Sequence, residues 1–204
     1  MLNRDAVAAG VTVTASTGDA GSGNTVGTAA SDPWVIAAAG STSFQVYAQQ
    51  TSYGFQFSNG RYVSDQLSSL SSGSITQTNR VPDLLAPGDL GWATCSDKLL
   101  PNGDPQYFDC TDNNGNLANL QVFGGTSQSS PFTAGAAALV IQAYRRAHGG
   151  ASPSPDQVRR VLDSSADDLH LPAQDQGAGL LNSLRAVQLA ASLGSASNTG
   201  LACC

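Results

Sequence analysis

The sequence has little charge, few basic residues and no long apolar run. Only 12% of its 204 residues are Asp, Glu, Lys or Arg, nine are basic, and the net charge is −6. Nucleic-acid binding needs clustered Lys and Arg to neutralise phosphates, so a nucleic-acid partner is not expected. The longest apolar run, residues 134–141, is far too short to cross a bilayer, so no membrane partner is expected either.

The start of the chain also lacks a secretory signal, because "MLNRDAVAAGVTV" contains no long apolar segment before a cleavage site. Few lysines, many Ser, Thr, Gly and Asn residues and four cysteines are nevertheless typical of an exported protein. Cys95 and Cys110 bracket a turn-rich polar loop and predict a disulfide in an oxidising compartment. Cys203 and Cys204 have no explanation. We therefore expect a secreted protein whose export signal is encoded upstream of Met1.

Short apolar runs alternate with helical patterns along the chain. Strands are predicted over residues 11–17, 34–42, 81–88 and just before Gly124. Helices are predicted over residues 131–147, after an N-cap at Ser154, and within residues 180–194. Residues 43–80 are predicted as surface hairpins and loops. This alternation predicts an α/β fold with a mostly parallel sheet, one domain over residues 1–194 and a frayed tail over residues 195–204.

The stretch "GGTSQSSPFTAGAAALV" (124–140) passes from a glycine-rich turn into an apolar helix. Ser127 is predicted to lie just outside the start of the helix over residues 131–147. Unpaired N–H groups and the positive end of the helix dipole favour negative charge there. Two interpretations follow from the residues. Ser127, Ser129 or Ser130 caps the helix, or Ser127 is a nucleophile whose oxyanion is stabilised by those N–H groups.

Two other site types fit the sequence poorly. "STGDAGSGNTVG" follows the first strand, but its third glycine, Gly27, comes one residue late for a dinucleotide fingerprint, and no P-loop Lys is present. The nucleophile elbow of α/β-hydrolases needs glycines two residues before and two after the serine. Gly125 fits that spacing, but position 129 is Ser. What remains is an acid, Asp19, at the exit of a buried strand, where α/β folds place functional groups.

Five segments in order resemble the C-terminal half of a subtilisin-like serine peptidase, a subtilase. They are "GVTVTASTGDAG", "ASDPWVIAAAGST", "VPDLLAPG", "GGTSQSSPFTAGAAALV" and "QGAGLLNSLRAV". The fourth contains the specific nucleophile motif Gly-Thr-Ser-x-x-x-Pro. The resemblance implies the three-layer subtilisin-like α/β fold with a mostly parallel sheet, of which this chain is only the C-terminal half.

The resemblance also implies a serine endopeptidase that works through an acyl-enzyme on Ser127. The backbone N–H of Ser127 and the side chain of Asp19 are implied to stabilise the oxyanion. Most members have Asn at the position of Asp19, whereas sedolisin relatives keep Asp; a carboxylate cannot donate a hydrogen bond, but a protonated acid can. The residues implied to line the substrate cleft are Ala15, Ser16, Thr17 and Gly18.

One part of the family pattern is missing from this chain. Subtilisin-type triads run Asp, His, Ser, so Asp and His should both precede Asp19. Asp5 is the only acid there and no His occurs, while His148 and His170 follow Ser127 and are expected to be surface residues. We therefore expect the isolated chain to be inactive, with a polypeptide substrate and the missing N-terminal half of the domain as partners. The alternative is a non-catalytic truncated remnant or an interaction protein.

No cofactor is expected, and calcium stays open as a metal that the family resemblance implies but no motif supports. The bound ion common in this family has no recognisable site here, because "DNNGN" (112–116) lacks the spaced acids of a calcium loop. The cysteine spacing does not fit zinc either.

Overall fold

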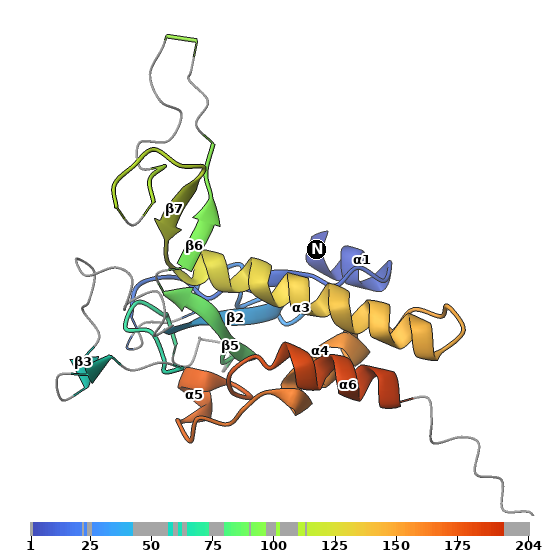
Figure 1. The fold of residues 1–204 in the computed structure, drawn as a ribbon. Coiled ribbons are helices and arrows are strands. Elements are labelled where there is room, and N and C mark those ends of the chain that lie inside the picture. Colours follow the sequence, from blue (N-terminus) through green and yellow to red (C-terminus); the bar gives the residue numbers. More distant parts are fainter. Residues whose placement is uncertain are drawn as a thin grey trace, which may run out of the picture.

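The computed structural model describes residues 2–21, 23, 26–42, 57–58, 61–62, 65–73, 80–89, 91–96, 101–102, 110–112 and 114–193 (Figure 1). The tail expected over residues 195–204 lies outside the described residues, as does most of the segment 43–80. Within that segment a short antiparallel pair, β3 (Phe57–Ser58) and β4 (Arg61–Tyr62), is described.

A three-stranded parallel sheet forms the centre of the fold. Its strands are β1 (Thr14–Ser16), β2 (Ile36–Thr42) and β5 (Leu84–Asp89), hydrogen-bonded in the order β1-β2-β5. The predicted parallel α/β sheet is confirmed, although each strand begins a few residues later than the sequence pattern suggested. All seven residues of β2 are buried, because β2 is the central strand and both of its faces are covered.

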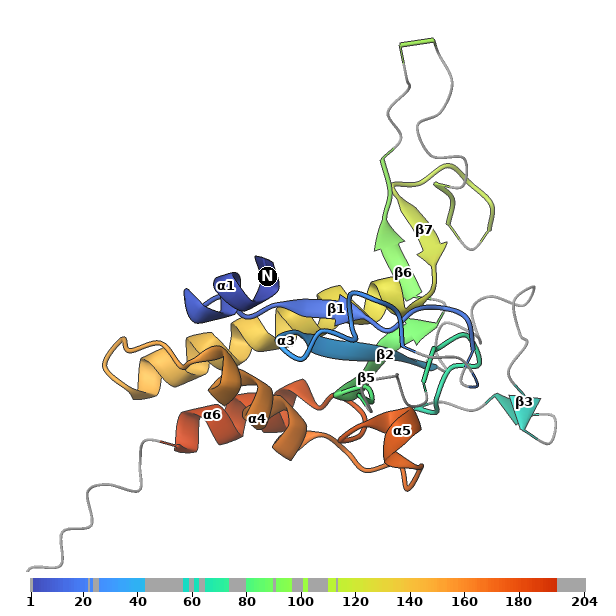
Figure 2. The same cartoon turned by 180° about the vertical axis from the view of Figure 1, so that it is seen from behind.

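Helices cover the sheet, and the longest of them, α3 (Thr126–Ala147), runs across it (Figures 1 and 2). The other helices are α1 (Leu2–Ala8), α4 (Pro155–Ser165), α5 (Ala173–Gln176) and α6 (Ser183–Ser192). The main core lies between the sheet and α3, α4 and α6, where Leu84, Val140, Val158 and Leu162 are fully buried. Among the described residues, no helix is both long and apolar enough to cross a membrane.

The helix boundaries agree with the sequence at α4 and differ at α3. Ser154 caps α4 through a capping box with Gln157, as its sequence predicts. The start predicted at Pro131 is wrong, because α3 begins five residues earlier, at Thr126. A proline is usually read as a helix start or break, but here it removes only the bond to the carbonyl of Ser127, close to the helix end.

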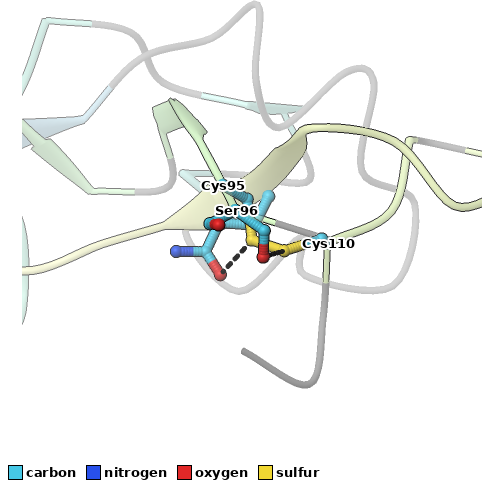
Figure 3. Close-up of a disulfide and its surroundings, with 4 residues drawn as sticks. Cys95, Ser96 and Cys110 are labelled. Atoms are coloured by element: carbon cyan, nitrogen blue, oxygen red, sulfur yellow. Dashed lines mark hydrogen bonds between the residues drawn. A yellow bond between two sulfur atoms is a disulfide. The ribbon is translucent and has the colours of Figure 1, made fainter. Parts of the chain in front are cut away.

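The two strands that precede α3 project away from the central sheet (Figures 1 and 2). Strand β7 (Leu120–Phe123) is found where predicted, but it pairs antiparallel with β6 (Gly91–Thr94) and not with the central sheet. The predicted disulfide between Cys95 and Cys110 is confirmed, with their Cα atoms 5.5 Å apart and the Ser96 carbonyl beside the bridge (Figure 3). In the chain-entropy account such a loop closure stabilises the fold by about 3 kcal/mol.

Candidate active site

Thr126, the first residue of α3, joins the helix to the turn that follows β1. Its N–H donates to Asp19 Oδ1 at 2.6 Å, and its hydroxyl donates to the same oxygen at 2.9 Å. The hydroxyl oxygen also accepts the Gly18 N–H at 3.0 Å. Thr126 is almost fully buried whereas Asp19 is exposed, and together these three bonds fix the Asp19 turn against the start of α3.

The helix is therefore capped by a residue distant in sequence. The N-cap residue is Gly125, which offers no side chain, so the Asp19 carboxylate takes the first N–H group. The interpretation that a local serine caps this helix is wrong. Ser129 Oγ donates to the Ala86 carbonyl, and Ser130 Oγ contacts Thr14 Oγ1 at 3.0 Å.

Ser127 is the second residue of α3 and not, as predicted from the sequence, a residue just outside it. Its side chain is exposed. Of the first three N–H groups of the helix, that of Thr126 donates to Asp19 and that of Gln128 to the Gly125 carbonyl. The Ser127 N–H has no hydrogen-bond partner among the described residues. An exposed hydroxyl thus lies beside a free donor at the positive end of a 22-residue helix, an arrangement suited to binding an anion.

The second carboxylate oxygen of Asp19 lies close to Gly125. No hydrogen bond to Oδ2 is found among the described residues, and a Cβ placed on Gly125 would lie 2.7 Å from this oxygen. Gly125 also has φ of 104° and ψ of 159°, a backbone region that only glycine adopts readily. Glycine at this position therefore allows both the backbone conformation and the close approach of the carboxylate.

Replacing Gly125 by alanine is expected to lower the free energy of unfolding by roughly 1–3 kcal/mol, from backbone strain together with the clash at Asp19. The matched control is Gly135→Ala in the same helix, where an added Cβ meets nothing within 4 Å. That control should instead stabilise the chain by up to about 1 kcal/mol, because alanine favours a helix over glycine. Urea denaturation of both variants tests this, and equal changes of the same sign would contradict it.

The predicted cleft residues lie along β1 and its exit. Thr17 is fully buried, its N–H donates to the Ala38 carbonyl and its own carbonyl accepts the Gly27 N–H. Ala15 packs against a small cluster of buried apolar residues on the face of the sheet away from α3. Ser16 and Gly18 are half-buried, and Gly18 adjoins Asp19. Their role towards a substrate stays a prediction.

Among the described residues, neither histidine nor Asp5 forms a hydrogen bond or ion pair with Ser127. His148 caps the opposite end of α3, which at 1.5 Å per residue is about 30 Å long. Its ring stacks on Tyr144 and its Nδ1 contacts the Tyr144 carbonyl. His170 is largely exposed beside Asp168, and Asp5 is exposed in α1 beside Arg4. Within the described part of the chain, no three His, Cys, Asp or Glu side chains gather as a metal site.

Reasoning from the sequence missed Thr126 as the link between the two loops. The available signal was the Thr of the Gly-Thr-Ser motif itself, which precedes Ser127 directly. The residues it must reach, Gly18 and Asp19, are more than 100 positions earlier, so no local pattern could reveal the contact.

Comparison with known proteins gives a consistent picture. Residues 1–181 match the sequence profile of the subtilase family. A solved structure described as a lanthipeptide protease superposes with a TM-score of 0.63 at 22% identity, over 92% of this chain and 53% of its own. Fervidolysin from Fervidobacterium pennivorans, described as a keratinolytic enzyme related to subtilisin, superposes with a TM-score of 0.61 at 22% identity. The superposition covers 90% of this chain and 23% of fervidolysin.

At this identity the two structures show a common fold only. This chain spans about half the length of the first protein and under a quarter of the second. No curated protein sequence matches the chain.

Proposed function

The chain belongs to the subtilase family, and we propose on that premise that it is the C-terminal part of a serine endopeptidase domain with Ser127 as nucleophile. The observation that carries the proposal is the start of α3. There an exposed Ser127 hydroxyl adjoins its own free N–H group, at the positive end of the helix. A helix N-terminus that holds both a nucleophile and a donor is suited to acyl transfer.

In the proposed reaction Ser127 Oγ bonds to the carbonyl carbon of the scissile peptide. Its proton passes to a base and then to the leaving amine, after which water hydrolyses the acyl-enzyme ester. The negative charge that develops on the carbonyl oxygen is stabilised by the Ser127 N–H and by Asp19. Because Thr126 already occupies Oδ1, the oxygen of Asp19 free to carry and donate a proton is Oδ2.

The base and its orienting acid come from the N-terminal half of the domain, which we propose as the structural partner. Two features support this. β1 is an edge strand of the central sheet, and an edge strand offers its backbone groups for pairing. On α3, Phe132 and Leu139 are each about half exposed (48%) although the helix crosses the middle of the fold. An apolar surface of this kind is expected to be covered by further protein.

The substrate is an extended polypeptide that lies along the exit of β1, past Ala15, Ser16, Thr17 and Gly18. We also propose that the protein acts outside the cell. The Cys95–Cys110 disulfide supports this, because such bridges persist in oxidising compartments.

The isolated chain is expected to show negligible peptidase activity, because a serine without a base is a poor nucleophile at neutral pH. The test compares it with the complete peptidase domain, meaning this chain joined to the in-frame segment encoded upstream of Met1. A fluorophosphonate probe should label only the complete domain. Ser127→Ala should abolish the labelling, whereas Ser129→Ala, two residues along the same helix, should leave labelling at Ser127. Among the described residues the Ser129 hydroxyl donates to the Ala86 carbonyl, so Ser129 is a buried structural serine and a suitable control.

Rapid labelling of the isolated chain at Ser127 would contradict the expectation that this chain lacks a general base. A complete domain that folds but is not labelled would contradict the proposed peptidase activity. So would a stop codon upstream of Met1 in place of segments that carry the Asp and the His. Either outcome would favour the non-catalytic remnant.

A further inference from the structure

Ser72 holds the two peptide groups that flank Asp19. Its N–H donates to the Gly18 carbonyl at 2.7 Å, and its hydroxyl accepts the Ala20 N–H at 3.0 Å. One residue thus bonds the backbone immediately before and immediately after Asp19. Ser72 itself is only 1% exposed, so its side chain has little room to move away from these bonds.

The Asp19 turn is consequently held from two sides by different parts of the chain. Thr126 binds the Gly18 N–H and the carboxylate, while Ser72 binds the Gly18 carbonyl and the next N–H. Gly18 has φ of 106°, and a Cβ there would lie 3.2 Å from the Ser72 hydroxyl. The turn is therefore tightly confined, which limits where its carboxylate can point.

The segment that carries Ser72 is itself fixed to the central strand. The Ser68 N–H donates to the Gly40 carbonyl of β2 at 2.9 Å, and Ser68 Oγ donates to Asp89 Oδ2 of β5 at 2.7 Å. A further bond runs from the Gly21 N–H to the Leu70 carbonyl. Ser72 is therefore held in place relative to β2, and its bonds to Gly18 and Ala20 hold the Asp19 turn in place relative to the same strand.

We infer that Ser72 is a positioning residue for the oxyanion-stabilising carboxyl of Asp19. The inference rests on the proposed function of Asp19. Among the described residues Ser72 bonds only backbone groups of the turn, so it is inferred to act through Asp19 and not on the substrate. Oxyanion stabilisation depends on a donor fixed in advance near 3 Å from the developing charge, and small displacements lower rates strongly.

The first test uses the isolated chain and needs no peptidase activity. Ser72→Ala leaves the Ala20 N–H without its hydroxyl acceptor, and Ser71→Ala does the same to the Gly40 N–H. The two serines are adjacent and equally buried, so the second variant controls for general destabilisation. In Ser72→Ala, hydrogen exchange of the Thr126 amide should rise by about 10-fold, and the Asp19 carboxyl ¹³C signal should shift. In Ser71→Ala both should stay within about twofold of the parent.

The second test measures peptide hydrolysis by the complete peptidase domain. Ser72→Ala should lower kcat by about 10-fold with KM nearly unchanged, because the lost interaction acts in the transition state. Ser71→Ala should keep kcat within about twofold. If Ser72→Ala does not fold, Ser72→Cys keeps the size and a weak acceptor, and an intermediate effect is expected.

Equal changes in the Ser71 and Ser72 variants, or an unaltered Thr126 amide and Asp19 signal in folded Ser72→Ala, would overturn the inference. A parent domain that cleaves no peptide would overturn the proposed function instead, and the exchange comparison would still decide whether Ser72 positions the Asp19 turn.

Discussion

Replacing Asp19 by alanine is expected to lower the turnover of the complete peptidase domain by about 100-fold or more, the range measured for loss of one side-chain oxyanion donor in a related serine peptidase. KM should change little, because the donor acts on charge that develops only in the transition state. Asp19→Asn should retain activity. Its Oδ1 can still accept both bonds from Thr126, and its Nδ2 donates from the place where Oδ2 now lies.

Turnover and stability together separate this role from simple capping. If Asp19 donates to the oxyanion, the Ala variant loses turnover, whereas the Asn variant keeps a donor and retains it. If Asp19 only caps α3, the Ala variant loses about 1 kcal/mol of stability and keeps its turnover. Measurements of kcat for parent, Asn and Ala, together with denaturation of each, distinguish the two. A fully active Ala variant would exclude Asp19 from the oxyanion hole.

The elements that the sequence predicts well are those whose causes are local. β2 opens with an apolar run over residues 36–39, typical of a strand buried on both faces, and that pattern is visible in the sequence. α4 starts where Ser154 and Gln157 form a capping box, with Pro155 at the first helical position, a signal contained within four residues. The disulfide follows from two cysteines that bracket one loop. In each case the predictive signal lies within one short stretch of the sequence.

The start of α3 could not be predicted in this way, because its cap lies far away in the chain. Gly125 and Thr126 provide no side-chain cap of the usual kind, and the first N–H group is satisfied by Asp19, 107 positions earlier. The same holds for Ser72, 52 positions from the Ala20 N–H that it accepts. Family resemblance pointed to Ser127 and Asp19 as the site, but the residues that hold them follow only from tertiary contacts.

A partly buried group of charges beside α4 could not be predicted from the sequence either. Arg159 donates to the carbonyls of Pro33 and Val35, and Arg80 forms an ion pair with Asp83 at 2.7 Å. Both arginines are therefore engaged elsewhere, and the buried Asp163 Oδ1 has no hydrogen-bond partner in the part of the chain that the structure describes. Burial, and then the negative charge of Asp83, raise the pKa of Asp163 to about 7, against the smaller opposing effects of the two arginines.

This arrangement predicts that the stability of the chain falls as pH rises from about 4 to about 7. The folded state keeps the Asp163 proton up to about pH 7, whereas the unfolded chain releases it near its ordinary pKa of 3.8. Folding therefore takes up a proton within this window, and ionised Asp163 opposes folding above it. The full shift corresponds to about 4 kcal/mol, and partial access of solvent to the carboxyl reduces the expected penalty to about 2–4 kcal/mol.

Asp163→Asn removes the titrating group and keeps its shape, so at pH 8 it should raise the free energy of unfolding by the same 2–4 kcal/mol, about the whole linkage penalty. At pH 4 the variant and the parent should agree to within about 1 kcal/mol, because the parent's Asp163 is then neutral in the folded state and only partly ionised in the unfolded chain, so little of the penalty has developed. Comparing variant with parent at each pH cancels the effect of the other carboxylates, whose titration is common to both chains.

Asp5→Asn is the matched control, since it removes the same charge from a side chain that is 63% exposed. Denaturant titrations of the three chains at pH 4 and pH 8 measure the effect. A gain at pH 8 no larger for Asp163→Asn than for Asp5→Asn would mean that Asp163 is ionised without penalty, and that its buried oxygen finds a partner in solution.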